Sequence, residues 1–271
     1  MPKIAELYIY PIKSCGGIPV DRAVLTPSGF EHDREFVLID SNGAFLSQRK
    51  VPKMCLIRTS ICNEWLEVMT ADYDDRLIIP LSDGEGEKVE VDIWGRVGRG
   101  IDMGDRPSRW FEKNLGVPCR LLQYDPTFQR KREDPRGGND IPLSFADGYP
   151  LLLISQASLD DLNSRTTVPI PMNRFRPNIV VTDCDPYAED GWDVIDTTEA
   201  TLKGGKLCVR CPIPTIDQET GLNGKEPLLA LSKYRRLPAL PGIPVKGVVF
   251  GKNFACLHHG GLEIGDILEV A

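Results

Sequence analysis

Short apolar runs broken by proline and glycine are the feature that most constrains the fold of this chain. Five segments have the length of β-strands, at residues 4–10, 36–39, 77–79, 89–93 and 120–124. In 89–93, valine and isoleucine alternate with acidic residues, which predicts one buried and one solvated face. Because 22 prolines and 25 glycines interrupt the sequence, we expect a β-rich α+β fold with few helices.

Three stretches predict short helices. Residues 107–115 begin with proline and are followed by glycine, the usual asymmetry of helix ends. Residues 157–164 contain Ser158 and Asp161, spaced as in a capping box. The third stretch, 228–234, follows a proline and has a weaker pattern. None of the three is long, so helices contribute little to the predicted body.

Residues 125–140 separate two β-rich parts of the chain. The segment is polar, rich in proline and glycine, and non-periodic, which is typical of a linker or a long surface loop. Its basic cluster Arg130-Lys131-Arg132 is followed at once by two acidic residues, so we expect it to lie in a solvated loop. We therefore predict a first domain over residues 1–124 and a second over residues 141–271.

Composition excludes several classes of function. The net charge of the 271 residues is −7, which argues against a general nucleic-acid-binding protein. No apolar run approaches the roughly 18 residues of a membrane span, and the first residues lack the pattern of a signal peptide. We expect a cytoplasmic protein. Its eight cysteines are then expected to be free thiols.

Two cysteines three positions apart, Cys208 and Cys211, are the strongest candidates for chemistry, with Arg210 beside the second. A neighbouring cation favours the reactive thiolate. Three alternatives stay open on the motif alone. A zinc site would need further ligands such as Cys256 and His258, and a thioredoxin-like pair would need a following helix. The two thiols could also be inert.

Cations gather at the ends of predicted strands. Lys13 and Ser14 lie in a glycine-rich turn after the first strand, where an ammonium, a hydroxyl and open backbone N–H groups can bind a phosphate. Arg34 and Arg176 each stand at the entrance to a strand. Taken singly, each also fits an ordinary turn or a surface ion pair.

Together these motifs resemble the MOSC family of molybdenum cofactor proteins, in the group of the mitochondrial amidoxime reducing components and their bacterial counterparts. The resemblance covers nearly the whole chain. Its motifs occur in register as Tyr10-Pro-Ile-Lys-Ser, Asp33-Arg34, Phe175-Arg-Pro-Asn178, Cys208-x-Arg-Cys211 with Thr215-x-Asp217 and Gly221, Lys225-Glu-Pro-Leu228, Phe250-Gly-x-Asn253 and Gly265-Asp266. It implies an N-terminal β-barrel-like domain packed on a MOSC β-barrel domain.

The resemblance also implies a molybdenum cofactor and the residues that hold it. Cys211 would be the catalytic residue and the metal ligand, since thiolate suits a soft metal, with Arg210 favouring its ionised form. Cys208 would pack behind it. The remaining implied cofactor contacts are Lys13, Ser14, Arg34, Ser155, Arg176, Asn178 and Thr215, and Asp217 is a candidate proton donor.

The activity implied by the family is reduction of N-hydroxylated compounds such as amidoximes, hydroxylamines and N-hydroxylated bases. The chain has no dinucleotide fingerprint, so a separate electron donor is expected: a cytochrome b5 with its reductase, a ferredoxin or a flavoprotein. The alternative is a cofactor carrier or sulfur-transfer module without turnover of its own. MOSC domains also end molybdenum cofactor sulfurases, so the family is associated with pyridoxal phosphate, but the pyridoxal phosphate domain that those enzymes need is not expected in this sequence. A mitochondrial location would require that a targeting segment had been removed.

Overall fold

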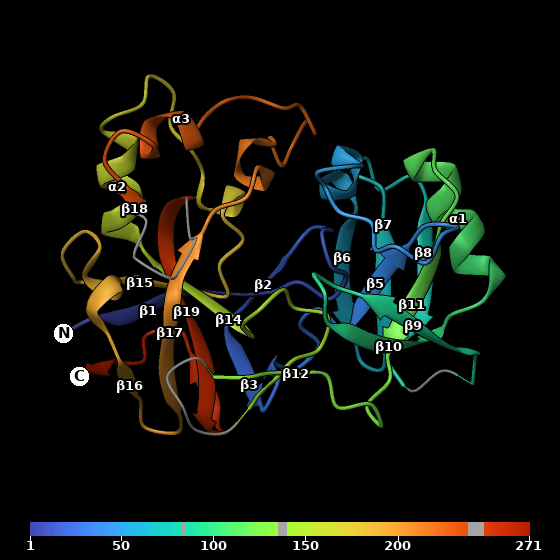
Figure 1. The fold of residues 1–271 in the computed structure, drawn as a ribbon, viewed down its shortest axis with the longest axis horizontal. Helices are drawn as coiled ribbons and strands as arrows, with labels where there is room; N and C mark the ends of the chain where they lie inside the picture. The colour runs from blue at the N-terminus through green and yellow to red at the C-terminus, as the bar shows by residue number, and fades with distance from the viewer. Residues whose placement is uncertain (83–84, 135–139, 238–246) are drawn as a thin grey trace.

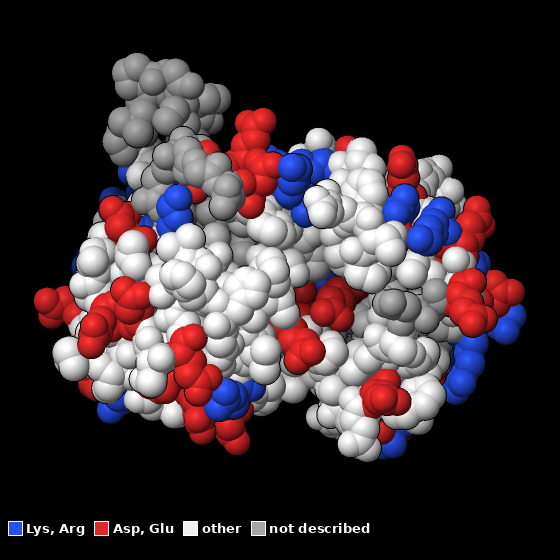
Figure 2. All heavy atoms as spheres, turned by 90° about the horizontal axis from the view of Figure 1, so that it is seen from below, with Lys and Arg blue, Asp and Glu red and all other residues white. Residues whose placement is uncertain are grey.

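The computed structural model describes residues 1–82, 85–134, 140–237 and 247–271, and strands dominate it (Figure 1). One lobe contains a large sheet, and the other contains two smaller sheets and the longest of the described helices. The prediction of a β-rich α+β fold with few short helices is confirmed. A second view shows acidic and basic side chains interspersed over one face and a hollow between the lobes (Figure 2).

The larger sheet takes strands from both ends of the chain. Among the described residues its order is β2-β1-β15-β14-β19-β17-β16-β21, with β18 also paired to β19. The strands are β1 (Lys3–Ile9), β2 (Ile18–Val20), β14 (Leu151–Ser155), β15 (Ile179–Thr182), β16 (Val194–Asp196), β17 (Thr201–Val209), β18 (Arg236–Leu237), β19 (Gly247–His258) and β21 (Glu269–Val270). The first strand therefore lies beside β15, about 170 positions later in the chain, and is antiparallel to it.

The other lobe is built from two sheets, ordered β5-β11-β10-β9 and β6-β7-β8. Their strands are β5 (Phe36–Ile39), β6 (Arg58–Cys62), β7 (Trp65–Met69), β8 (Arg76–Pro80), β9 (Lys88–Asp92), β10 (Val97–Asp102) and β11 (Arg120–Tyr124). Two smaller sheets complete the strand pairing of the described residues. One pairs β20 (Gly261–Glu263) with β3 (Arg22–Thr26) and β4 (Gly29–Phe30), and the other pairs β12 (Lys131–Arg132) with β13 (Ile141–Pro142). The domain boundaries at 124 and 140 stay a prediction.

The described helices are close to those predicted, but one cap differs. They are α1 (Asp105–Leu115), α2 (Gln156–Asn163) and α3 (Leu228–Leu231), with short 3-10 turns at η1 (Pro52–Leu56), η2 (Met172–Arg174), η3 (Ala188–Gly191) and η4 (Ile213–Thr215). Gly116 ends α1 with a φ of 76°, a left-handed conformation that suits glycine. The predicted capping box at Ser158 is wrong. Ser155 is the N-cap of α2, and its side chain accepts a hydrogen bond from the Ser158 N–H.

Separate apolar cores stabilise the two lobes. Phe36, Met54 and Phe111 lie in the core of the smaller-sheet lobe, against α1. One face of the large sheet buries a cluster that includes Leu7 and Phe254. Its other face packs against α2 and α3 through residues such as Phe250. The large sheet is thus covered on both faces, which fixes the ends of β1, β15 and β17.

The predicted solvated loop at Arg130 is wrong. Arg130 is only 2% exposed, and its guanidinium Nη1 donates to the backbone carbonyls of Ser144 and Ala146, both at 2.7 Å. A buried guanidinium needs such acceptors, because leaving it unpaired would be costly. Only Lys131 of the cluster is exposed, and Arg132 is half-buried. Residues 135–139 of the predicted linker lie outside the described residues.

Candidate functional site

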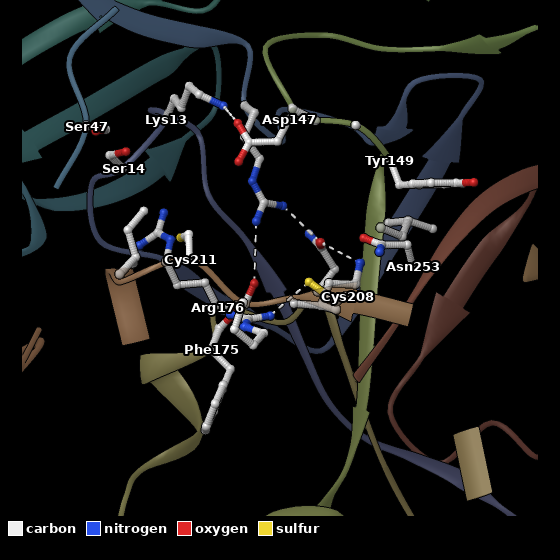
Figure 3. Close-up of a pocket in the computed structure, with 18 of the residues that line it drawn as sticks. Lys13, Ser14, Ser47, Asp147, Tyr149, Phe175, Arg176, Cys208, Cys211 and Asn253 are labelled. Carbon is white, nitrogen blue, oxygen red and sulfur yellow. Dashed lines mark hydrogen bonds and ion pairs between the residues drawn. The ribbon is translucent and has the colours of Figure 1, made fainter. Parts of the chain in front are cut away.

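A cavity of ≈200 Å³ lies between the lobes, lined by residues from both halves of the chain (Figure 3). It brings together eight of the candidate residues singled out in the sequence: Lys13, Ser14, Arg34, Arg176, Asn178, Cys208, Arg210 and Cys211. They come from the turn after β1, the segment before β5, the segment before β15 and the end of β17. Segments far apart in sequence thus supply one pocket.

Three of these residues have a backbone conformation that most side chains avoid. The φ angles of Ser14, Arg34 and Arg176 are 71°, 52° and 57°. Left-handed conformations in residues other than glycine are uncommon and cost free energy, and they are kept where the surrounding structure determines them. Each allows the chain to turn sharply so that a side chain enters the pocket from a strand end.

Tyr10 organises the cations, a role that the sequence did not reveal. The guanidinium carbons of Arg34 and Arg176 lie 4.5 and 4.3 Å from the centre of its ring. Its hydroxyl donates to the carbonyl of Pro177 at 3.0 Å, and its N–H donates to the carboxylate of Asp33 at 2.8 Å. Cation–π attraction and these hydrogen bonds hold two positive charges next to one buried ring.

The two arginines on Tyr10 differ in their partners. Arg34 pairs with Asp33 and donates to the side-chain oxygen of Asn178 at 2.9 Å. Within the described part of the chain, no side chain or carbonyl accepts a hydrogen bond from the guanidinium of Arg176. Burial lowers the pKa of Arg176, and the nearby charge of Arg34 adds to that effect. Both effects would be relieved by an anion in the pocket.

Lys13 enters the same pocket from the other side. Its ammonium donates to the carbonyl of Phe145 at 2.7 Å. It also pairs with Asp147 (Figure 3). Burial lowers the pKa of Lys13. The ammonium of Lys13 and the indole N–H of Trp94 lower the pKa of the Asp147 carboxyl to about 2. Asp147 is therefore ionised at neutral pH.

Both cysteines of the motif line the cavity and both are half-buried. Arg210 was expected to favour the thiolate of Cys211; its hydrogen bonds go to other groups, and that effect stays a prediction. Arg210 donates from Nη1 to the sulfur of Cys208 at 3.1 Å and from Nη2 to the carbonyl of Phe175 at 2.7 Å. Arg210 directly follows Val209, the last residue of β17, and its N–H donates to the carbonyl of Val248 at 2.8 Å, so its guanidinium lies beside Cys208.

Three other predicted residues do not line the cavity. Ser155 is fully buried and caps α2, and Thr215 donates from its hydroxyl to the carbonyl of Pro212 at 2.7 Å. Asp217 pairs with Arg174 at 2.9 Å. The polar atoms of these three side chains bind neighbouring protein groups and so stabilise the local structure.

Several lining residues were missed by the sequence analysis. Ser47 and Arg49 lie on the segment between β5 and η1. Asp147 and Tyr149 lie on the segment that leads into β14. The basic cluster at 130–132 was the sequence feature that could have indicated the segment at 144–149, because its arginines bind the backbone of that segment. Besides the contacts of Arg130, Arg132 donates to the carbonyl of Gly148 at 3.1 Å and lies 4.5 Å from the centre of the Tyr149 ring.

The zinc alternative and the question of a membrane span can be compared with the fold. Among the described residues, no three His, Cys, Asp or Glu side chains gather as a metal ion would require, so the zinc site suggested for Cys208, Cys211, Cys256 and His258 is not formed by them. In the same part of the chain, no helix is both long and apolar enough to cross a membrane.

Comparison with known proteins places the chain in a family. The MOSC N-terminal beta barrel domain model matches residues 1–118, and the MOSC domain model matches residues 140–269. Human mitochondrial amidoxime-reducing component 1 is 33% identical, over 97% of this chain and 81% of the relative. Human mitochondrial amidoxime reducing component 2 is 32% identical, over 97% of this chain and 82% of the relative. The molybdenum cofactor sulfurase of Oryza sativa subsp. japonica is 34% identical over 86% of this chain, but only 31% of that protein is covered. The chain therefore belongs to the MOSC family, with a MOSC N-terminal domain followed by a MOSC domain.

Proposed function

We propose that this protein is a molybdenum cofactor-dependent reductase of N-hydroxylated compounds, with Cys211 as the metal ligand. The observation that carries the proposal is the guanidinium of Arg176, which lines the cavity without a hydrogen-bond acceptor among the described residues. A thiol pair lines the same cavity. An anionic group and a soft metal are the ligands that such a site would accept.

The residues of the cavity fit this cofactor. Its phosphate would be held by Lys13, Ser14 and Arg176, which combine two cations with a hydroxyl donor. Arg34 and Asn178 are tied to each other and would line the pterin. Cys211 would bind the metal because its sulfur has no Arg210 partner, whereas the sulfur of Cys208 accepts from that guanidinium.

When bound, molybdenum would supply the two-electron chemistry that removes oxygen from nitrogen. The chain's own residues would position the cofactor and offset its negative charge. Asp147 would accept hydrogen bonds rather than donate a proton, because its pKa is about 2. Asp217 has no support as a proton donor, because it does not line the cavity. We infer that the protons reach the substrate from solvent.

The electron donor and the location in the cell are part of the proposal. We propose a separate donor of the cytochrome b5, ferredoxin or flavoprotein type, because no dinucleotide fingerprint occurs in the sequence. The two human relatives are mitochondrial by name. A cytoplasmic location for this protein stays a prediction, and fluorescence microscopy of the tagged protein in its own host would test it.

The test uses protein expressed in a host that makes the cofactor. Molybdenum and pterin contents are measured first, followed by reduction of benzamidoxime with dithionite-reduced methyl viologen as the electron source. We expect Cys211→Ser to lose molybdenum and turnover. The matched variant Cys208→Ser should keep its metal. Equal loss of molybdenum in both variants would instead indicate a shared dithiol site, and absence of turnover by fully loaded protein would refute the reductase.

A second candidate function is a cofactor carrier or sulfur-transfer module. It is favoured by the similarity to the rice molybdenum cofactor sulfurase and by the two thiols that line one pocket. This function predicts a persulfide on Cys211, detectable as a mass increase of one sulfur atom after incubation with a cysteine desulfurase and cysteine. Loaded protein would then show no turnover of benzamidoxime.

A further inference from the structure

Trp94 occupies a position that a tryptophan rarely takes. It lies in the two-residue turn between β9 and β10, where the N–H and carbonyl groups of Ile93 and Arg96 bond to each other at 3.0 and 3.3 Å. The φ angles of Trp94 and Gly95 are 58° and 77°. Positive φ at both central residues is the pattern of a type I′ turn, which favours asparagine, aspartate or glycine. A bulky residue there is strained, and such strain is concentrated at functional sites.

Trp94 is also exposed, and it reaches the rim of the cavity. Nearly half of its surface, 48%, faces solvent. Its indole N–H donates to the carboxylate of Asp147 at 2.9 Å, and its ring meets that of Phe45 edge to face at 5.1 Å. Both Asp147 and Phe45 line the cavity. The strained turn thus presents an aromatic face beside the entrance of the pocket.

Arg49 lies on this aromatic face. Its guanidinium carbon is 4.1 Å from the centre of the Trp94 ring, and Arg49 lines the cavity. Its polar contact within the described residues runs from Nε to the hydroxyl of Ser47, at 3.5 Å, the long limit for a hydrogen bond. Lys13 and Trp94 both donate to Oδ1 of the nearby Asp147 carboxylate. Among the described residues, no acceptor is hydrogen-bonded to the terminal nitrogens of Arg49, so these nitrogens can bind a ligand.

Asp147 and Phe45 connect this arrangement to Lys13, but its ring and its guanidinium are not those that hold the two buried arginines. Arg34 and Arg176 lie on the buried ring of Tyr10, whereas Arg49 lies on the exposed ring of Trp94. Tyr10 and its two arginines are inside the site, whereas Trp94 and Arg49 are at its rim. The part of Trp94 that stays exposed with Arg49 on its ring, together with the guanidinium fork, suits a planar molecule that carries a carboxylate or a phosphate.

We propose that Trp94 and Arg49 form a substrate platform that selects planar N-hydroxylated compounds bearing an anionic group. The proposal rests on the reductase function above and adds a substrate class to it. Trp94 stacks on the ring of the substrate, and Arg49 binds its carboxylate or phosphate. The anion is recognised at a distance from the N–O group that is reduced.

Two substrates that differ only in charge test the platform: benzamidoxime and 4-carboxybenzamidoxime, with methyl viologen as the electron source. We expect kcat/KM of the native protein to favour the carboxylate by about tenfold, the effect of one charge-assisted hydrogen-bonded pair at a partly exposed site. In Arg49→Gln this ratio should fall toward one. The matched control Lys50→Gln removes the same charge from the neighbouring, exposed residue and should keep the ratio.

Trp94→Asn tests the aromatic half of the platform, since asparagine suits the turn. We expect its melting temperature to be at least that of the native protein, while KM rises for both substrates with little change in kcat. Calorimetric binding of the product 4-carboxybenzamidine should weaken in both platform variants, independently of turnover.

The outcomes separate the two proposals. Equal kcat/KM for both substrates in the native protein would overturn the platform and leave the reductase intact. No reduction of either substrate by loaded protein would refute the reductase itself. Loss of molybdenum in Arg49→Gln would assign Arg49 to the cofactor site and would also overturn the platform.

Discussion

Replacing Arg130 by methionine should destabilise the protein and loosen one wall of the pocket. Methionine has a similar length and no charge, so the main loss is in hydrogen bonding. The guanidinium donates to two carbonyls at 2.7 Å, those of Ser144 and Ala146, and more weakly to that of Ile93 at 3.4 Å. The segment that it holds carries Asp147 into the cavity.

The loss of stability can be worked out from the two carbonyl groups that lose their donor. Each buried carbonyl that loses its donor costs about 1–3 kcal/mol, which gives roughly 2–6 kcal/mol for the two short bonds. Part of this is offset, because methionine avoids burying a charge and removes Nε, which is buried without a partner. We expect a net loss of about 2–4 kcal/mol in the free energy of unfolding.

Urea denaturation followed by circular dichroism measures this loss. Lys131→Met is the matched control, because Lys131 is exposed and its ion pair with Asp140 is at the surface; we expect a change of about 0.5 kcal/mol or less. Hydrogen exchange should also speed up over residues 144–149 in Arg130→Met alone. A stability within about 0.5 kcal/mol of the native value, with unchanged exchange, would refute the role assigned to Arg130.

Three further predictions concern the surroundings of the site. Ser155→Ala removes the cap of α2 and should cost about 1 kcal/mol in urea denaturation, with an unchanged molybdenum content; loss of metal would restore the predicted cofactor contact. Tyr10→Phe keeps the ring and should keep molybdenum, while losing about 1 kcal/mol in the free energy of unfolding with the hydroxyl bond. Tyr10→Leu should lose molybdenum, and equal molybdenum contents in the two variants would show that the ring does not hold the cations. The hydrogen bond with Glu35 raises the pKa of His32, so its stabilisation is present below the ordinary histidine pKa and disappears as the pH rises through the raised value. Glu35→Gln should therefore lower the melting temperature more at pH 5.5 than at pH 8.5, and a pH-independent difference would contradict this linkage.

The parts of the site that could be predicted are those set by local sequence. Lys13, Arg34 and Arg176 each stand at a strand end, and a strand end can be read from an apolar run and its neighbours. The cap of α1 at Gly116 was predicted for the same reason, because it depends on adjacent residues. The family motifs then related these separate positions to one pocket.

What could not be predicted depends on contacts between distant segments. The cluster at Arg130 looked solvated because its sequence neighbours are polar, but its partners lie 14 and 16 positions away. Ser155 and Ser158 are both plausible caps in sequence, and only the backbone geometry decides between them. Arg49 and Asp147 carry no motif of their own, and they meet only when the two lobes come together.

The position of β1 affects the order in which the protein can be completed during synthesis. This strand is made first, yet its neighbour β15 is residues 179–182. On the ribosome, residues 3–9 must remain without that partner until about two-thirds of the chain has been made, and unpaired apolar strands are prone to aggregate. Lys13 and Ser14 follow this strand directly, so their site cannot form before β15 has been made. A fragment that stops at residue 124 would expose the first strand, and we expect it to bind chaperones and to lack the pocket.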